Sequence, residues 1–179
     1  MNRRYFLSSA MALGAVAALA RIPGVARPLV QDAKGSQGAH GAGASPKRIK
    51  KIIKTDAEWK SLLTPEQYSV MRQKGTEAPY SSPLTDIHDK GTFVCAACEL
   101  PLFSSAQKFD SGTGWPSFWA PIKKENLREE VDRSLSEVRT EVLCARCDGH
   151  LGHVFEDGPN PTGLRYCMNG VALKFVKKA

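Results

Sequence analysis

Apolar and polar positions follow two different patterns along the chain, and the change falls near Gly91. Before it, "KTDAEWKSLL" predicts a first helix with Thr55 or Asp56 as its cap. After it come short apolar or alternating runs separated by turn residues, which indicate strands. These runs are "TFVCA", "LREEVDR", "EVRTEVLCA", "HLGHVF", "LRYCM" and "VALKFVK". Together the patterns predict a helical N-terminal arm followed by a compact antiparallel β domain.

A second helix is predicted in "TPEQYSVMRQKG". Thr64 can cap it, Pro65 suits its first turn, and Gln67 completes a capping box. Gly75 is expected to end it.

One of the predicted strands shows a clear alternation. Val138, Thr140, Val142 and Cys144 alternate with polar or exposed positions. This is the pattern expected for a half-buried strand, with one face on the core.

The N-terminus has the features of an export signal. Arg3 and Arg4 precede an apolar stretch from Tyr5 to Ala20, shorter than the ~20 apolar residues that a membrane span usually needs. Small-x-small cleavage sites end at Ala20 and at Ala26. Residues 1–26 are therefore predicted to be an export signal. An uncleaved membrane anchor is the alternative.

The type of signal bears on where the protein works. The paired arginines resemble a twin-arginine signal, which exports folded proteins in bacteria. We expect an exported protein, periplasmic or otherwise extracytoplasmic, attached to a membrane only if the signal is retained. Residues 27–48, rich in Gly, Ala, Ser and Pro, are expected to form a flexible linker. The folded domain is then expected at 49–179.

The net charge of +7 is unevenly distributed. Residues 1–48 contain seven Lys/Arg and one Asp, whereas residues 49–179 contain eighteen Lys/Arg and seventeen Asp/Glu. The excess belongs to the signal and linker, and the folded part has no basic block that would bind phosphates. We therefore expect no nucleic-acid partner.

Four of the five cysteines form two C-x-x-C pairs, Cys95–Cys98 and Cys144–Cys147. Two such pairs are typical of a tetrahedral site in which four thiolates surround one structural Zn²⁺ at about 2.3 Å. Two disulfides or two redox motifs are the alternatives, but no βαβ context for a redox motif is present. Export to an oxidising compartment favours disulfides, unless the domain folds and binds zinc before a twin-arginine pathway exports it.

The fifth cysteine, Cys167, has neighbours that suit a reactive thiol. On a regular strand Arg165, Cys167 and Asn169 share one face, and an approaching guanidinium lowers the pKa of a thiol. His150 and His153 are candidate proton donors or acceptors, since four cysteines already fill a zinc site. The alternative is a buried structural thiol.

The stretch "FDSGTGWPSFW" combines glycines with an indole. Gly112 and Gly114 permit a tight or left-handed backbone. They place Trp115 on a loop, where it can form an apolar wall for a ligand. A tryptophan in the core is an equal alternative.

These motifs together resemble the B-type methionine sulfoxide reductases, which reduce peptide methionine (R)-S-oxide. The resemblance covers about residues 58–173. It is carried by four ordered blocks: "EWKSLLTPEQYSVMRQKGTEAPYSSPL", "GTFVCAACELPLFSSAQKFDSGTGWPSF", "CARCDGHLGHVFEDGP" and "PTGLRYCMNGVAL".

The resemblance implies a mainly β fold of two antiparallel sheets with a structural four-cysteine zinc site. It implies that Cys167 is the nucleophile and that Trp115 contacts the methyl group of the substrate. His150, His153, Arg165 and Asn169 would line the site and act on the sulfoxide oxygen and bound water. The substrates would be oxidised proteins or peptides, and we expect a monomer.

The sequence departs from a common family pattern at Thr113, where many members have a second, resolving cysteine. The resemblance therefore implies a one-cysteine enzyme, whose Cys167 sulfenic acid is reduced by an outside thiol such as a thioredoxin-like protein. Two other classes remain as alternatives. One is a non-catalytic zinc-stabilised binding module, and the other is a thiol–disulfide oxidoreductase that uses a C-x-x-C pair.

Overall fold

The computed structural model describes residues 49–178. The predicted export signal at 1–26 and linker at 27–48 lie outside these residues and stay predictions. No helix in 49–178 is both long and apolar enough to cross a membrane.

Two short helices open the described part, as predicted. Helix α1 spans Asp56–Leu62 and helix α2 spans Pro65–Gln73. Thr55 caps α1, and Thr64 caps α2 in the predicted capping box with Gln67.

The end of α2 differs from the prediction. Lys74, rather than Gly75, adopts the left-handed conformation, with φ of 58°. Gly75 follows it and donates its N–H to the Ser69 carbonyl at 3.0 Å. The Lys74 ammonium lies 2.7 Å from the buried Glu141 carboxylate, and this ion pair helps to offset the cost of a left-handed non-glycine residue.

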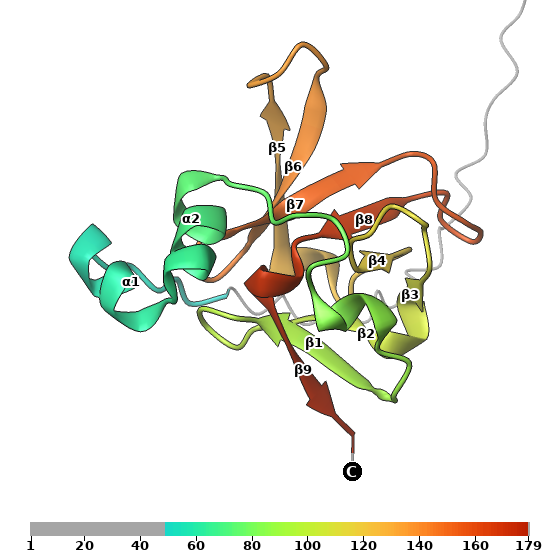
Figure 1. The fold of residues 1–179 in the computed structure, drawn as a ribbon, viewed down its shortest axis with the longest axis horizontal. Coiled ribbons are helices and arrows are strands. Elements are labelled where there is room, and N and C mark those ends of the chain that lie inside the picture. Colours follow the sequence, from blue (N-terminus) through green and yellow to red (C-terminus); the bar gives the residue numbers. More distant parts are fainter. Residues whose placement is uncertain (1–48, 179) are drawn as a thin grey trace, which may run out of the picture. The chain divides into compact units, whose positions relative to one another are not determined.

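The strands form two antiparallel sheets, which confirms the predicted fold class (Figure 1). The smaller sheet has the order β2 (Pro101–Ser104), β1 (Gly91–Cys95) and β9 (Leu173–Lys177). The larger has the order β3 (Lys108–Phe109), β4 (Ser117–Phe118), β8 (Arg165–Met168), β7 (His150–Phe155), β6 (Arg139–Cys144) and β5 (Leu127–Asp132). The 3₁₀ turn η1 (Pro83–Asp86) precedes β1, and the turns η2 (Ser105–Gln107), η3 (Lys124–Asn126) and η4 (Gly170–Ala172) lie between strands.

Strands β2, β3 and β4 have no clear apolar alternation in the sequence. Strands β5 and β6 form a hairpin that projects from the rest of the domain in Figure 1.

An aromatic cluster lies in the core and joins the two sheets. Phe103 of β2 stacks on Phe118 of β4 with ring centroids 4.4 Å apart, and Phe93 of β1 meets Phe118 edge-on at 4.9 Å. Tyr166 of β8 packs beside Phe103. Such aromatic pairs add about 0.5–1.5 kcal/mol each beyond the effect of burial, so this cluster fixes β8 against the smaller sheet.

Strand β6 is more buried than the predicted half-buried strand. Val142 and Cys144 face the core as expected, but Glu141 and Leu143 on the other face are also buried, and Val138 is exposed and precedes the strand. The second face is covered because Lys74 and His150 both contact the Glu141 carboxylate.

The pleat of the larger sheet separates a reactive face from a core face. Cys167 of β8 pairs with His153 of β7, so their side chains lie on one face. Tyr166 and Met168, which flank Cys167 in β8, are buried on the opposite face of the sheet. Gly152 brings the backbones of β7 and β8 close together, because a Cβ there would lie 2.1 Å from the Cys167 carbonyl oxygen.

We predict that Gly152→Ala destabilises the domain severely. The added methyl would also lie 2.9 Å from the Met168 Cα, and overpacking of this kind, added to backbone strain, should lower the free energy of unfolding by about 3 kcal/mol or more. Gly163→Ala is the control: Gly163 also has a positive φ, of +71°, but nothing lies within 4 Å of the place that an added methyl would take. It should cost only the strain of about 1–2 kcal/mol. Equal losses for the two variants in denaturant unfolding would contradict the close-approach argument.

Candidate active site and metal centre

The two C-x-x-C pairs form two equivalent turns, one at the end of β1 and one at the end of β6. In each, the N–H of the first cysteine donates to a carbonyl five residues on, and the residue four positions on donates back to the cysteine carbonyl. The residue that donates back, Glu99 or Asp148, has a left-handed φ of 59° or 56°. The turns direct the sulfurs of Cys95 and Cys98, and of Cys144 and Cys147, toward one point.

The four sulfurs have the geometry of a metal site. They all lie within 4.8 Å of one another, with Cys95 and Cys147 at 3.6 Å and Cys98 and Cys144 at 3.5 Å. A tetrahedron with bonds of about 2.3 Å has edges of about 3.8 Å, so the cluster fits a four-thiolate metal ion. All five cysteines of the chain are free, which rules out the disulfide alternative for this structure. Because the pairs share one cluster, neither is an isolated redox motif.

Cys167 lies in the middle of the larger sheet. Its strand β8 pairs with β4 at Ser117 and with β7 at His153. The side chain opens into a cavity of about 120 Å³ on the reactive face. The cavity is lined by Thr76, Trp115, Arg139, Gly152, His153, Phe155, Cys167 and Asn169. Four of the six predicted catalytic and substrate-binding residues therefore meet in one cavity: Cys167, Trp115, His153 and Asn169.

The indole of Trp115 forms one wall of the cavity, which decides between the two interpretations of the glycine-rich loop. Its Nε1–H donates to the Glu77 carbonyl at 3.2 Å. The loop bends at Gly112 and Gly114, both with positive φ. A Cβ at Gly114 would collide with Tyr80 at 2.8 Å, so only glycine fits there.

The amide of Asn169 has a fixed orientation. Its Oδ1 accepts the Glu77 N–H at 3.0 Å, and its Nδ2 donates to the Leu151 carbonyl at 3.1 Å. A reversed amide would face donor with donor and acceptor with acceptor. Because Nδ2 carries two hydrogens, one N–H of Asn169 stays available to a ligand in the cavity.

His153 is held by the projecting hairpin. Its Nε2 contacts the Asp132 carboxylate at 2.8 Å, and the Arg139 guanidinium donates to the same oxygen at 2.6 Å. The Ser134 N–H donates to the other oxygen of Asp132 at 2.9 Å. These contacts hold the pKa of Asp132 well below its usual range, with the Ser134 contacts first and His153 after them. Asp132 therefore presents a carboxylate that fixes the imidazole.

The structure does not bring His150 into the cavity. The side chain is 2% exposed, and its Nδ1 contacts Glu141 at 2.8 Å. Burial lowers its pKa, although Glu141 opposes the shift, so the neutral ring donates from Nδ1 to the carboxylate. It packs edge-on against His153, with ring centroids 5.4 Å apart. The predicted catalytic role of His150 stays a prediction.

Arg165 also lies outside the cavity lining. Its guanidinium makes two hydrogen bonds to Asp157, at 2.8 and 2.7 Å, and lies over the Phe155 ring at 4.4 Å. It supports Phe155, which lines the cavity, and it faces the same side of β8 as Cys167. Its predicted role in binding substrate stays a prediction.

The net effect of the surroundings on the pKa of the Cys167 thiol is opposite to the lowering that Arg165 suggested in the sequence. Burial raises the pKa of Cys167 above its ordinary value. The hydroxyl of Thr113, whose Oγ1 lies 3.9 Å from Sγ, and the charge of Arg165 act in the opposite direction but do not cancel the effect of burial. The resting residue is therefore mainly a thiol at neutral pH.

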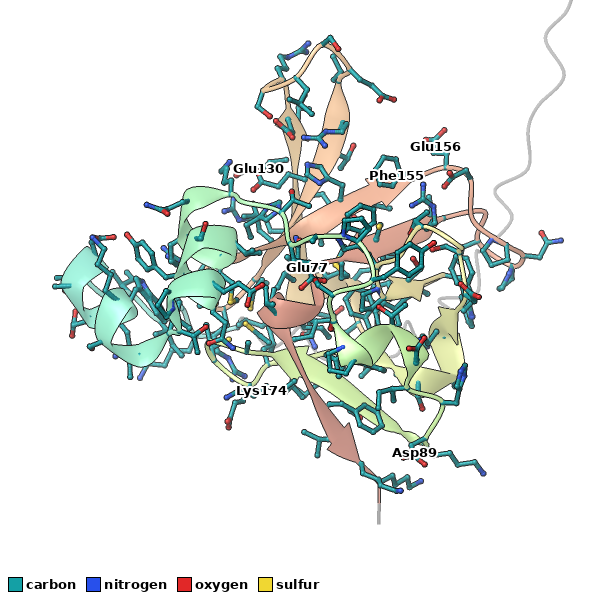
Figure 2. The ribbon with its side chains drawn as sticks, in the orientation of Figure 1. Glu77, Asp89, Glu130, Phe155, Glu156 and Lys174 are labelled. Carbon is teal, nitrogen blue, oxygen red and sulfur yellow. The ribbon has the colours of Figure 1, made fainter. Side chains whose placement is uncertain are left out.

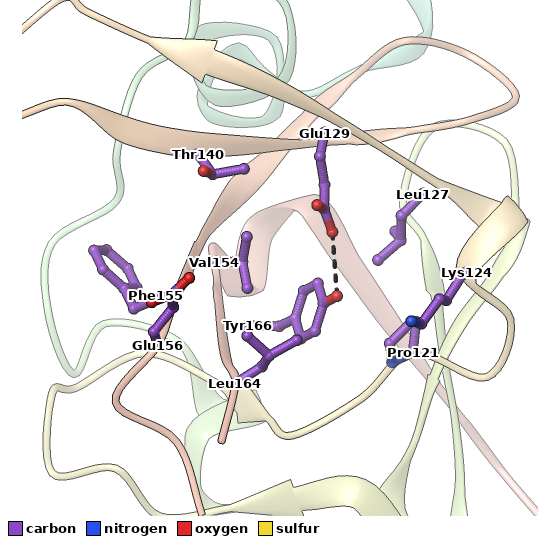
Figure 3. A pocket seen from close by; sticks show the side chains of 10 residues that line it. All are labelled: Pro121, Lys124, Leu127, Glu129, Thr140, Val154, Phe155, Glu156, Leu164 and Tyr166. Carbon is purple, nitrogen blue, oxygen red and sulfur yellow. Dashed lines mark hydrogen bonds between the residues drawn. The ribbon is translucent and has the colours of Figure 1, made fainter. Parts of the chain in front are cut away.

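A larger groove of about 440 Å³ lies on the core face of the same sheet (Figure 3). Tyr166, Val154 and Leu164 form its apolar floor, and the Tyr166 hydroxyl donates to Glu129 at 3.1 Å. Burial raises the pKa of Tyr166 to about 12. None of the described residues that line this groove is a cysteine or a histidine, so we place the chemistry in the smaller cavity.

Sequence reasoning missed six residues of this site: Thr76, Arg139, Gly152 and Phe155 in the lining, and Asp132 and Glu77, which hold lining residues. The alternation of the β5–β6 hairpin contained a signal for two of them. Asp132 and Arg139 pair across the two strands and share a face with His153 through the pleat. Nothing local in the sequence marks Glu77, because its contacts are more than 30 residues away.

Comparison with known proteins agrees with this geometry. The SelR domain model matches residues 63–177. The chain is 56% identical over 125 residues to a peptide methionine sulfoxide reductase MsrB of Hahella chejuensis, covering 70% of this chain and 90% of that protein. Proteins of the same name from Leptospira interrogans and Methanosarcina mazei are 55% and 57% identical, covering 71% and 72% of this chain and 97% and 91% of theirs. The chain therefore belongs to the MsrB family of peptide methionine sulfoxide reductases, as its motifs predicted.

Proposed function

We propose that the domain reduces the R epimer of methionine sulfoxide in peptides or proteins, with Cys167 as the nucleophile. The observation that carries this proposal is that Cys167, Trp115, His153 and Asn169 line one cavity of about 120 Å³. A methylsulfinyl group needs a thiol to attack its sulfur, an apolar wall for its methyl group and polar groups for its oxygen, and this cavity has all three.

The cavity can distinguish the three substituents on a sulfoxide sulfur. The Trp115 and Phe155 rings offer an apolar surface to the methyl group. The free N–H of Asn169 and the imidazole of His153 offer polar contacts to the oxygen. When the methyl group and the oxygen are both held in these places, Cys167 can make an in-line approach to the sulfur of only one epimer. The third substituent, the peptide chain, extends out of the cavity through its mouth.

The first chemical step transfers oxygen from the substrate sulfur to Cys167. The thiolate attacks the sulfoxide sulfur while the oxygen is protonated, which makes that sulfur electrophilic. The oxygen then moves from the substrate sulfur to the Cys167 sulfur: the S–O bond of the substrate and the new S–S bond break, methionine leaves, and Cys167 becomes a sulfenic acid. The step consumes no net proton, because the proton that leaves the Cys167 thiol can pass through His153 to the oxygen.

The second step requires a thiol from another molecule. Thr113 lies near Cys167 on the glycine-rich loop, where many relatives have a cysteine, and the other four thiols are gathered in the metal cluster. An outside thiol condenses with the sulfenic acid and releases water, and a second thiol then reduces the mixed disulfide. A thioredoxin-like protein supplies both thiols.

The metal is Zn²⁺ in this proposal. Four thiolates in a closed tetrahedral arrangement are the ligand set of structural zinc sites, and no ligand position is left for a substrate. The ion would fix the ends of β1 and β6 and take no part in the chemistry. We further propose that the monomeric domain acts outside the cytoplasm, as the features of residues 1–26 suggest.

The proposal is tested by a stereospecific assay. The purified domain is given the R and S sulfoxides of an N-blocked methionine with dithiothreitol as reductant. Cys167→Ser should abolish reduction of the R sulfoxide, because a hydroxyl is a far weaker nucleophile at neutral pH, while metal content and thermal stability stay those of the wild type. Reduction by this variant at more than a trace would disprove the role of Cys167.

Removal of the metal should destabilise the whole domain. Cys98→Ser should release zinc and lower the free energy of unfolding by several kcal/mol, since a structural zinc site contributes about 10–16 kcal/mol of binding energy to folding. Metal analysis and thermal unfolding check this, and Cys167→Ser is the matched control for loss of a thiol. A metal-free protein that melts with the wild type would contradict a structural role.

A single turnover without reductant should leave a sulfenic acid at Cys167. Dimedone should then label one residue per chain, found by peptide mapping. In Thr113→Cys the introduced thiol should form a disulfide with Cys167 and suppress labelling, because residue 113 already lies near the sulfur. Thr113→Ser is the matched control and should label like the wild type. A disulfide between Cys167 and a cluster cysteine in the wild type would refute the one-cysteine mechanism.

A further inference from the structure

Glu77 is a buried acidic residue that belongs neither to the lining of the Cys167 cavity nor to the four-cysteine cluster. Its side chain is 5% exposed and lies beside η4, the short helix that follows β8 (Figure 2). The preceding residue, Thr76, lines the cavity. The segment that carries both residues joins α2 to η1 and makes no strand.

The backbone of Glu77 holds two walls of the cavity. Its N–H donates to the Asn169 Oδ1 at 3.0 Å, and its carbonyl accepts the Trp115 Nε1–H at 3.2 Å. One residue's backbone thus fixes both the amide that faces the sulfoxide oxygen and the indole that faces the methyl group.

The side chain of Glu77 anchors that backbone to the segment after the nucleophile. Its two carboxylate oxygens accept the N–H groups of Gly170 at 2.6 Å and Val171 at 2.9 Å. These two residues begin η4, directly after Asn169 and three and four positions after Cys167. One residue therefore links the Cys167 strand, the amide and the indole through four hydrogen bonds.

The anchor is tightly enclosed. A Cβ at Gly170 would lie 1.9 Å from the Ser82 hydroxyl and 3.3 Å from the Glu77 carboxylate, so the helix start cannot move toward either. Burial raises the pKa of Glu77, and the two backbone donors act against that rise. A carboxylate in such a place is costly unless its partners are well aligned, and no described cation pairs with it.

We propose that Glu77 is a positioning residue for the reduction, which sets Trp115 and Asn169 at a fixed place relative to Cys167. This inference rests on the proposed function. It predicts that changes at Glu77 reduce the efficiency and the epimer selectivity of the enzyme while the Cys167 thiol itself stays normally reactive.

The test compares Glu77→Gln with Glu125→Gln, which changes an exposed glutamate. The amide of Gln presents an N–H to one of the two backbone donors, so the anchor must shift. We expect kcat/KM for the R sulfoxide to fall by about 10- to 100-fold, and the R-to-S preference to fall with it. The rate at which iodoacetamide alkylates Cys167 should stay within about twofold of the wild type, because the change affects the placement of the substrate and not the thiol itself. Glu125→Gln should match the wild type in all three.

Rates are measured well below the melting temperature of each variant, so that a loss of stability alone does not lower them. If Glu77→Gln lowers the melting temperature but keeps wild-type kcat/KM and selectivity, Glu77 is merely structural and the inference is overturned. If the wild type itself fails to reduce the R sulfoxide, the proposed function fails instead. Glu77→Asp, which keeps the charge but is one methylene shorter, should show an intermediate loss.

A second arm breaks the same link from the side of the indole. Trp115→Phe keeps an aromatic ring but removes the N–H that bonds the Glu77 carbonyl. It should lower both kcat/KM and selectivity, and its effect should combine with Glu77→Asp less than multiplicatively, because both break the same link. Wild-type selectivity in Trp115→Phe, or fully multiplicative effects, would overturn the proposal.

Discussion

Four cysteine sulfurs, all within 4.8 Å of one another, hold the central strand of the smaller sheet to a strand of the larger one. Apolar contacts also join the sheets, namely the aromatic cluster of Phe93, Phe103 and Phe118 and the side chains packed against it. A domain of this size has a core of modest extent, and a metal ion bound by the four cysteines would add a cross-link to it. The second cysteine turn also connects β6 to β7, since Cys144 ends one strand and His150 begins the next.

The reactive face of the larger sheet can be polar because the core, with its aromatic rings and clustered cysteines, packs against the other face. Glu141, His150, Asp132 and Arg139 all lie on the reactive face, with Glu141 and His150 buried and the other two partly buried. Each buried polar group costs free energy unless it is paired, and here carboxylates pair with imidazoles and cations. The result is an array in which His153 has a fixed position at the cavity wall.

Much of the fold could be predicted from the sequence, and the reasons are local. The capping box at Thr64, the strand at His150–Phe155 and the two cysteine turns depend on residues a few positions apart. The strand β4 could not be predicted, since its two residues pair with β8 about 50 residues away. The alternating pattern of β6 predicts one exposed face, whereas Lys74 and His150 cover that face from other segments.

The site was predictable where a residue's chemistry is itself rare, as with Cys167 and Trp115, and not where the role arises from contacts. His150 and His153 are equivalent in the sequence, three positions apart, yet the bulge between Val142 and Leu143 breaks the alternation of β7 against β6. It leaves His153 at the cavity and turns His150 to Glu141. The raised pKa of Cys167 follows from the same enclosure. An enclosed thiol is protected from chance oxidation when no substrate is present. In the proposed reduction the protonated thiol also brings the proton that the sulfoxide oxygen must acquire, so the burial that lowers the fraction of thiolate at rest also supplies what oxygen transfer would require.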